Sequence, residues 1–317
     1  MNNYKEIKEV LFNIPDDKLI LLAGHECPDM DSIGSTLALT RFLNKIGKKA
    51  FMLLEEKELK KLDWFKDNSY IISSSNENPY CFIFLDTNRK SRTGVYEKYF
   101  DNAELTINID HHENNKVEAK YVLSISEISA TSEIIYNFFK MFDIKIDKKT
   151  AELLYAGLIT DTYCFFQRTT SLTFMMAAEL LEYDIDYSMI TMECYSSITN
   201  EEANALTDML SNINYNEFHY IIINKKNDIY QNINYTTIFK KLVFIIRNIK
   251  EIKLLGIFML DDDNVIGEYR SNCDIEVDKL AQKLNGGGHK KSSGFVTNLS
   301  INEVIDITKD YIKSWQQ

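Results

Sequence analysis

Acidic residues and histidines occur together at four places in the first half of the chain. The first is the segment 25–31 (HECPDMD), which follows a short apolar run. The next two are Asp86, after the run CFIFL, and the triplet 110–112 (DHH). The fourth is Asp161, in the segment 156–162 (AGLITDT). Carboxylates and imidazoles are ordinary ligands of divalent cations, so these four segments predict a metal site if the fold brings them together.

Five aspartates in one place would repel one another and raise one another's pKa values unless cations held them ionised. These aspartates are Asp29, Asp31, Asp86, Asp110 and Asp161. Carboxylate and imidazole ligands without cysteine match Mn²⁺ or Mg²⁺. One carboxylate can bridge two such ions, which then lie about 3.5–4 Å apart, activate a bridging water and hold the oxygens of a phosphoryl group. The predicted chemistry is metal-assisted hydrolysis of a phosphoester.

Each of these segments alone has a structural explanation. An aspartate at the end of a strand commonly caps a helix or belongs to a turn. Two adjacent histidines can be one buried and one surface residue. The joint occurrence argues against a purely structural explanation. Four of the five histidines and five aspartates fall at predicted strand ends or glycine turns, which is more than chance placement would give.

A second group of residues lies far downstream, in the segment 285–294 (NGGGHKKSSG). Three successive glycines let backbone N–H groups turn toward an anion, and His289 can donate to a phosphate or a base. Shortly before it, Arg270 offers a planar guanidinium that suits phosphate recognition. Only six arginines are present in the chain, and three others near the first group are further candidate anion contacts: Arg89, Arg92 and Arg168.

Alternating strands and helices are expected to position the first group. Apolar runs predict strands at 18–24, 49–54, 81–85 and 105–109. Helical periodicity follows at 32–46, 130–142, 148–158 and 172–183. This alternation predicts an α/β fold whose first domain has a parallel sheet with helices on both faces. Ligands of such sheets bind outside the carboxyl ends of the strands, which is where the acidic residues and histidines lie.

The pattern changes beyond about residue 187. We predict a first domain over 1–190, a linker and connecting helix over 191–210, and a smaller α/β domain over 211–317, with a cleft between the two domains. The second domain is expected to contain strands at 219–224, 253–260 and 265–271, a helix around 237–249, and a helical segment that ends near residue 284.

Composition narrows the class of protein. The chain has 317 residues with 45% apolar and 26% charged residues, which is typical of globular proteins. It offers no run of about 20 apolar residues and no secretory leader, so we expect a cytoplasmic protein without a membrane partner. Five scattered cysteines argue against a disulfide framework or a structural zinc site. A net charge of −11 argues against long duplex nucleic acid and favours small anionic substrates.

In combination, the motifs resemble the DHH phosphoesterase superfamily. The matching segments run in the family's order: 24–35 (GHECPDMDSIGS), FLDT around Asp86, the DHH triplet and GLITDT at 157–162. The segment 285–295 (NGGGHKKSSGF) resembles the signature of the DHH-associated C-terminal domain, and 128–136 (ISATSEIIY) resembles the segment that follows the triplet. Length and domain plan are most similar to bacterial and mycoplasmal nano-RNases, which cleave RNA of two to five nucleotides and often dephosphorylate 3′-phosphoadenosine 5′-phosphate (pAp).

This resemblance implies a role for each motif residue. One metal would be held by His25, Asp29 and Asp86, and a second by Asp31, Asp86, His111 and Asp161, with Asp86 bridging them. Asp110 would orient a ligand histidine, and His112 would lie near the attacked phosphate, so that His112, Asp110 and Asp86 form the catalytic set. The substrate's terminal phosphate or sugar would be bound by residues of the second domain: Arg270, Ser271, Gly287, Gly288 and His289. The sequence departs from the family pattern at Met30 and Tyr163, where glycine is usual, and at Lys291 and Ser292.

The expected enzyme is a two-metal phosphodiesterase and phosphatase that releases 5′-mononucleotides from short RNA and AMP from pAp. Two Mn²⁺ ions are the expected cofactors, with Mg²⁺ or Co²⁺ as alternatives. The resemblance also makes a homodimer reasonable. Other functions stay open: hydrolysis of a cyclic dinucleotide or pApA, a DHH-type pyrophosphatase, a RecJ-like single-strand exonuclease, or a nucleotide binder without activity.

Overall fold

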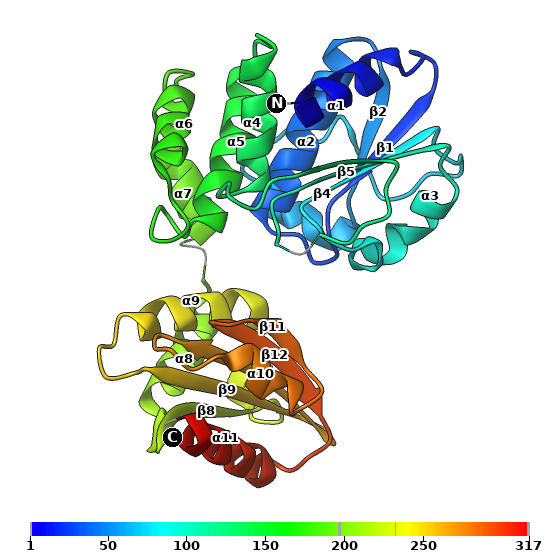
Figure 1. Cartoon of the computed structure of the whole chain (residues 1–317). Helices are drawn as coiled ribbons and strands as arrows, with labels where there is room; N and C mark the ends of the chain where they lie inside the picture. The colour runs from blue at the N-terminus through cyan, green and yellow to red at the C-terminus, as the bar shows by residue number, and fades with distance from the viewer. Residues whose placement is uncertain (1, 114, 196–197, 232, 316–317) are drawn as a thin grey trace. The chain divides into compact units, whose positions relative to one another are not determined.

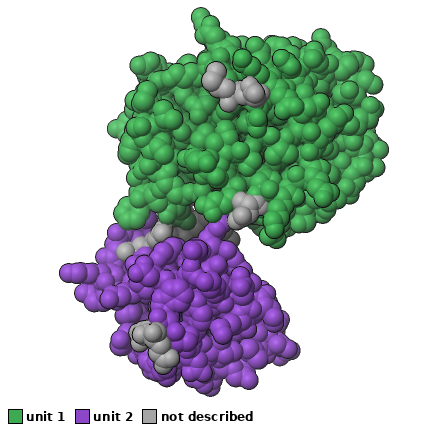
Figure 2. Space-filling model, in the orientation of Figure 1, with its two compact units in different colours: residues 1–197 green, residues 198–317 purple. Residues whose placement is uncertain are grey.

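The structure, a computed structural model, describes residues 2–113, 115–195, 198–231 and 233–315. Two compact units make up the chain, Met1–Ser197 and Ile198–Gln317 (Figure 2). Helix α8 (Asn200–Ser211), which falls in the predicted connecting segment 191–210, packs into a core of the second unit. The predicted cleft between the domains stays a prediction. Within the described ranges, no helix is both long and apolar enough to cross a membrane.

The first unit contains a six-stranded sheet with the order β3-β2-β1-β4-β5-β6, and every neighbouring pair of strands is parallel. Its strands are β1 (Leu19–Ala23), β2 (Lys49–Leu53), β3 (Ile71–Ile72), β4 (Cys81–Leu85), β5 (Leu105–Asp110) and β6 (Tyr121–Ser124). Its helices are α1 (Asn2–Asn13), α2 (Met30–Lys45), η1 (Glu56–Leu62), η2 (Lys90–Tyr96), α3 (Glu97–Asp101), α4 (Thr131–Met141), α5 (Lys148–Asp161), α6 (Ser171–Leu181) and α7 (Tyr187–Tyr195).

Buried apolar strands explain why this sheet is covered on both faces. All five residues of β1 and of β4 are buried. Successive β1 side chains point to opposite faces, so Ile20 and Leu22 enter the core shared with α1, α2, α4 and α5. Leu19, Leu21 and Ala23 enter the core shared with η2 and α3. Figure 1 shows α2 and α3 on opposite sides of the strands. The predicted parallel sheet with helices on both faces is confirmed.

Glycine lets α2 and α5 pack closely beside the sheet. A methyl group added at Gly34 of α2 would lie 2.4 Å from the Leu153 carbonyl oxygen of α5 and 3.6 Å from the Gly157 nitrogen. The obstacle is backbone, which cannot rotate away as a flexible side chain can. These two helices carry Asp31 and Asp161, so this close packing also sets the spacing of the candidate site residues.

We expect Gly34→Ala to destabilise the protein by about 2–3 kcal/mol, because the new methyl group forces the two helices apart. Helix propensity alone predicts the opposite sign, a gain of about 1 kcal/mol. Urea unfolding of the variant decides between the two effects, because they change stability in opposite directions, and Gly47→Ala serves as a comparison in which no clash arises. Gly47 has φ +88 and no heavy atom within 4 Å of an added methyl group, so its replacement tests backbone strain without a clash. A Gly34→Ala variant as stable as the unsubstituted chain would contradict this account of the packing.

The second unit has its own six-stranded sheet, with the order β11-β12-β10-β9-β8-β7. Only the β8–β9 pair is parallel among the paired strands described. Helices α8 and α9 cover one face and α10 and α11 the other, each with its own core. The remaining elements are β7 (Asn214–Asn216), β8 (Phe218–Asn224), η3 (Asp228–Tyr230), α9 (Tyr235–Arg247), β9 (Leu254–Asp261), β10 (Asn264–Ser271), α10 (Val277–Gln282), β11 (Gly287–His289), β12 (Ser292–Thr297) and α11 (Ile301–Trp315).

Candidate metal centre

Three adjacent strands of the first unit deliver the candidate ligands to one edge of the sheet. His25 follows β1 by two residues, Asp86 directly follows β4, and Asp110 is the last residue of β5. Strands β1, β4 and β5 are neighbours in the sheet, so their carboxyl ends lie side by side. The remaining candidates come from helices. Asp29 caps the N-terminus of α2, Asp31 lies in its first turn, and Asp161 is the last residue of α5.

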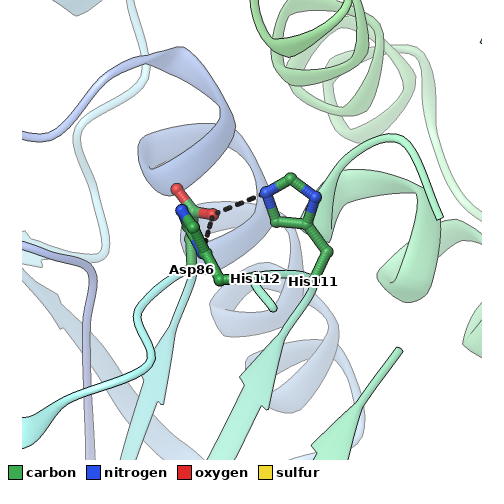
Figure 3. Close-up of side chains that lie close together, drawn as sticks. All are labelled: Asp86, His111 and His112. Atoms are coloured by element: carbon green, nitrogen blue, oxygen red, sulfur yellow. Dashed lines mark ion pairs between the residues drawn. The ribbon is translucent and has the colours of Figure 1, made fainter. Parts of the chain in front are cut away.

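The candidate ligand atoms form three overlapping groups, in each of which they lie within 4.8 Å of one another. The groups are His25 with Asp29 and Asp86, Asp86 with His111 and His112, and Asp31 with His111 and Asp161. Asp86 belongs to two of them. Its carboxylate oxygens lie 3.6 Å from His25 Nε2 and 3.5 Å from His111 Nε2. Figure 3 shows both histidines of the triplet directed toward the Asp86 carboxylate. All predicted metal ligands are therefore brought to one place.

The N-terminus of α4 holds two of these carboxylates. Asp31 is fully buried and accepts hydrogen bonds from the backbone N–H groups of Thr131 (2.7 Å) and Ser132 (2.8 Å). The Thr131 hydroxyl donates to Asp86 Oδ1 over 3.1 Å. The first backbone N–H groups of a helix have no acceptor within the helix, and they stabilise a carboxylate that accepts from them. Neither Thr131 nor Ser132 is among the predicted site residues, although both lie in the segment 128–136 that resembles the family segment after the triplet.

Hydrogen bonds fix the orientation of the histidine rings. His25 Nδ1 donates to the Glu26 carbonyl over 2.7 Å, and His111 Nδ1 faces the Ile128 carbonyl at 3.4 Å. A carbonyl can only accept, so each Nδ1 carries a proton, and Nε2 is the ring atom that faces the carboxylates. In each ring, Nε2 is therefore the atom placed to bind a metal.

Asp110 bonds to a different histidine. Its Oδ1 accepts from His112 Nδ1 over 2.7 Å, and its Oδ2 accepts from the Asn115 amide over 2.9 Å. The family resemblance implies that Asp110 orients a metal-ligand histidine, and the ligand histidine of the triplet that it implies is His111. The structure pairs Asp110 with His112 instead, because the side chains of Asp110 and His112 alternate onto the same side of the chain as it leaves β5.

Electrostatics disfavour the ionised form of these carboxyl groups in the absence of cations. Burial raises the pKa of Asp86 well above its ordinary value, and the carboxylates of Asp31 and Asp29 raise it further. Burial raises the pKa values of Asp31 and Asp161 in the same way. The buried Oδ2 of Asp161 has no hydrogen-bond partner among the described residues, and His111 Nε2 lies 3.2 Å from it. A buried carboxylate oxygen without a donor, next to other carboxylates and to imidazoles, fits a divalent metal ion.

We expect Mn²⁺ to raise the melting temperature of the protein by roughly 5–10 °C, since an ion present at about 100 times its dissociation constant stabilises by about 2.7 kcal/mol. The ions must displace protons from carboxyls with raised pKa values. The stabilisation should therefore weaken as pH falls from about 7.5 to about 5.5. Differential scanning fluorimetry with and without a chelator measures both effects. An equal shift in a variant that lacks Asp31 and Asp161 would contradict this assignment.

The predicted substrate-binding residues lie on or next to the strands at one edge of the second sheet, β10, β12 and β11. Register pairs Arg270 of β10 with Ser292 of β12, and Ser292 in turn with His289 of β11. Directly opposed residues share a face of the sheet, so these three side chains lie in one row. The Arg270 guanidinium donates to Glu268 Oε2 over 2.7 Å. This arginine is therefore paired within the second unit, and its contact with a phosphate stays a prediction.

The other predicted residues of this group are close by in the second unit. Ser271 is buried, and its hydroxyl donates to the Cys273 carbonyl. Gly287 leaves open space where a side chain would stand, whereas Gly288 has φ +144 and faces the β12 backbone, where a methyl group would lie 2.6 Å from the Ser292 carbonyl oxygen. Only glycine fits the second position, which explains part of the glycine run.

The departures from the family pattern have local explanations. Met30 starts α2 and is buried in the core of the first unit. Tyr163 has φ +50, a left-handed conformation in which glycine is easier to accommodate. Lys291 donates through its ammonium to the Cys273 carbonyl, and Ser292 belongs to β12. None of these residues contributes an atom to the three ligand groups.

The first unit is a parallel α/β unit with carboxylates and imidazoles at the carboxyl ends of its strands, and a second α/β unit follows it. These features define a class of protein with a divalent-metal centre. The model of the DHH family, N-terminal domain, matches residues 19–158, which include the triplet that ends β5. In these residues the chain matches the DHH family. The three ligand groups and this match together indicate that the protein uses divalent metal.

Relatives match nearly the whole chain. A probable bifunctional oligoribonuclease and PAP phosphatase NrnA of Streptococcus mutans is 27% identical over 96% of this chain and 97% of its own length. The bifunctional oligoribonuclease and PAP phosphatase NrnA of Bacillus subtilis is 28% identical over 87% of this chain and 88% of its own length. The crystal structure of an exopolyphosphatase-related protein from Bacteroides fragilis has a TM-score of 0.87 and 22% identity, and covers 99% of this chain and 96% of that one. The last similarity concerns the fold.

Proposed function

We propose that this protein is a metal-dependent phosphoesterase that hydrolyses very short RNA to 5′-mononucleotides and pAp to AMP. The observation that carries the proposal is the overlap of two ligand groups at Asp86, which suits two ions that share one carboxylate. The relatives that match most of the chain are named for the same two activities. The acidic net charge of −11 favours short substrates over long polyanions.

Two Mn²⁺ ions are the proposed cofactors, with His25, Asp29 and Asp86 binding one and Asp31, Asp86, His111 and Asp161 the other. When bound, such a pair supplies an activated water and neutralises charge on the phosphoryl group. The protein contributes rigid ligands, since the backbone of α4 holds Asp31 and the Thr131 hydroxyl holds Asp86. Rigid carboxylates keep the two sites at a fixed spacing.

His112 is the proposed proton donor to the leaving oxygen. Its side chain is 24% exposed, in contrast to the buried His111, and is therefore accessible to a substrate. Asp110 accepts from its Nδ1 and so directs its Nε2 outward. A buried carboxylate that holds an imidazole in one orientation and stabilises its protonated form is a frequent partner in general acid catalysis.

The second unit is proposed to bind the far end of the substrate through Arg270, Ser271, Gly287, Gly288 and His289. The row formed by Arg270, Ser292 and His289 supports this assignment, because it places a cation, a hydroxyl and an imidazole on one face. The open space at Gly287 gives access to the backbone of β11.

A panel of substrates and metals tests the proposal. The purified chain is incubated with an RNA dinucleotide, pAp, pApA, cyclic di-AMP, pyrophosphate and a long single strand of DNA, each with Mn²⁺, Mg²⁺, Co²⁺ or a chelator. We expect the RNA dinucleotide and pAp to be hydrolysed fastest, with Mn²⁺, and no turnover with the chelator. If neither the RNA dinucleotide nor pAp is hydrolysed with any of the three ions, the proposal is refuted. Preference for pApA or cyclic di-AMP would favour second-messenger turnover instead. A homodimer and a cytoplasmic location stay predictions.

A further inference from the structure

The metal centre is short of positive charge for an anionic substrate. Five aspartates lie in or beside it, and together they carry one more negative charge than two divalent cations neutralise. A phosphodiester adds a further negative charge, and pAp adds several. An anion approaches such a centre readily only if other cations lie close to it.

Three arginines of the first unit have guanidinium groups without a partner among the described residues: Arg89, Arg92 and Arg168. Of these, Arg92 and Arg168 lie close enough to candidate ligands to serve this purpose. Arg41 is held by Asp67 and Asp147. In contrast, the guanidinium groups of Arg92 and Arg168 make no hydrogen bond or ion pair with any residue that the structure describes. Arg92 is half-buried and Arg168 is exposed, so an anion can reach both.

Hydrogen bonds attach the backbone of each arginine to a segment next to the candidate metal centre. The Arg92 carbonyl accepts from the Glu26 backbone N–H over 2.5 Å, one residue after His25. The Arg168 carbonyl accepts from the Ser129 hydroxyl over 2.6 Å, two residues before Thr131, whose own hydroxyl contacts Asp86. The first arginine is thus fixed beside the group that contains His25, and the second beside the group that contains Asp161.

The electrostatic environment of these two ligands agrees with that placement. Burial lowers the pKa of His25, and the Arg92 guanidinium lowers it further, against the opposite effect of Asp29. Burial and nearby carboxylates raise the pKa of Asp161, and the Arg168 guanidinium acts against them. Each arginine therefore lies close enough to influence a ligand at one end of the centre.

The loop that carries Arg168 has an unusual backbone. Tyr163, Cys164, Phe165 and Arg168 all have φ between +50 and +66. Each such residue costs roughly 1–2 kcal/mol, and strain of this kind collects at functional sites. The loop is well ordered by its hydrogen bonds, among them Phe165 N–H to the Thr162 hydroxyl (3.1 Å) and Cys164 N–H to the Ile159 carbonyl (2.8 Å).

We propose that Arg92 and Arg168 are substrate-binding residues at the two ends of the metal centre, one for the phosphate under attack and one for a second phosphate of the same substrate. This inference rests on the proposed function and names the ligand class, a nucleotide with two phosphates separated by one nucleoside. The planar guanidinium matches phosphate oxygens, and its charge offsets the excess of carboxylate.

Arg92→Gln, Arg168→Gln and the control Lys5→Gln test the proposal. Lys5 is an exposed cation on α1, which contributes no atom to the centre. We expect each arginine variant to raise KM for pAp about 10–100-fold with kcat within roughly threefold, as expected for a lost charge-assisted hydrogen bond. The control should change neither constant. With bis(4-nitrophenyl) phosphate, which has one phosphate, only one arginine variant should keep its effect. Unchanged KM for pAp in both variants would overturn the proposal.

A second measurement excludes a role in holding the metal. Removal of a cation beside Asp161 should leave Mn²⁺ affinity unchanged or tighter, as measured by calorimetry on the Arg168→Gln variant. A clear loss of Mn²⁺ binding would mean that the arginine supports the centre, and the proposal would fail. If the unsubstituted chain does not turn over pAp, the proposed function fails separately. Equilibrium binding of pAp in the presence of Ca²⁺ then tests the role of the arginines. About tenfold weaker binding by the variants would support the proposal, and equal binding would contradict it.

Discussion

Replacing Asp86 by asparagine is expected to lower the hydrolysis of pAp by at least about 10³-fold, while leaving the metal-free protein as stable as before. Asp86 is shared between two ligand groups, so the substitution weakens both proposed sites at once. Asparagine is the suitable replacement because Asp86 has φ +58, a conformation that asparagine tolerates better than alanine. Initial rates with Mn²⁺ measure the loss.

Stability separates this effect from unfolding. Burial and neighbouring carboxylates raise the pKa of Asp86, which means that its ionised form is disfavoured in the metal-free protein. A neutral side chain at this position relieves that repulsion. The variant should therefore melt no lower than the unsubstituted chain without metal, and should gain far less from added Mn²⁺. Activity within tenfold of the unsubstituted chain would exclude Asp86 as the bridging ligand.

Much of the first unit could be predicted because its strands are buried on both faces. The run CFIFL gives β4 with its observed ends, and the aspartate that follows it is the residue on which two ligand groups depend. Parallel strands end at the same edge of a sheet, so residue type and position along the strand were enough to expect convergence. Asp161 was expected at the end of a glycine-containing segment. It lies at the end of a helix, because α5 continues three residues beyond the predicted end at 158.

Other features depend on contacts between distant segments, which residue spacing does not reveal. The bonds from Thr131 and Ser132 to Asp31 join residues 100 and 101 positions apart. The pairing of Arg270 with Glu268 is short in sequence, but it depends on rotamers that no pattern fixes. Likewise, the partner of Asp110 among two adjacent histidines depends on how the chain leaves β5, and composition is the same for either choice.

Substitution in the Asp110–His112 pair is also expected to cause a large loss of activity. Asp110→Asn is expected to lower kcat for pAp by roughly 10²–10³-fold, with KM within a few-fold. The native carboxylate is fully buried and accepts two hydrogen bonds, from His112 Nδ1 (2.7 Å) and the Asn115 amide (2.9 Å). An asparagine amide has only one accepting atom, so it must place its NH₂ group against one of these two donors. If it faces His112, the ring must carry its proton on Nε2 and cannot be held as the protonated donor.

A double-mutant cycle with His112→Gln shows whether Asp110 acts through that histidine. If it does, the double variant should be about as slow as His112→Gln alone, since the second change removes an interaction that the first has already eliminated. Losses that multiply in the double variant would show instead that Asp110 serves the neighbouring metal ligands directly. The general-acid assignment of His112 would then have to be abandoned, because the hydrogen bond that orients its ring would contribute nothing to the rate.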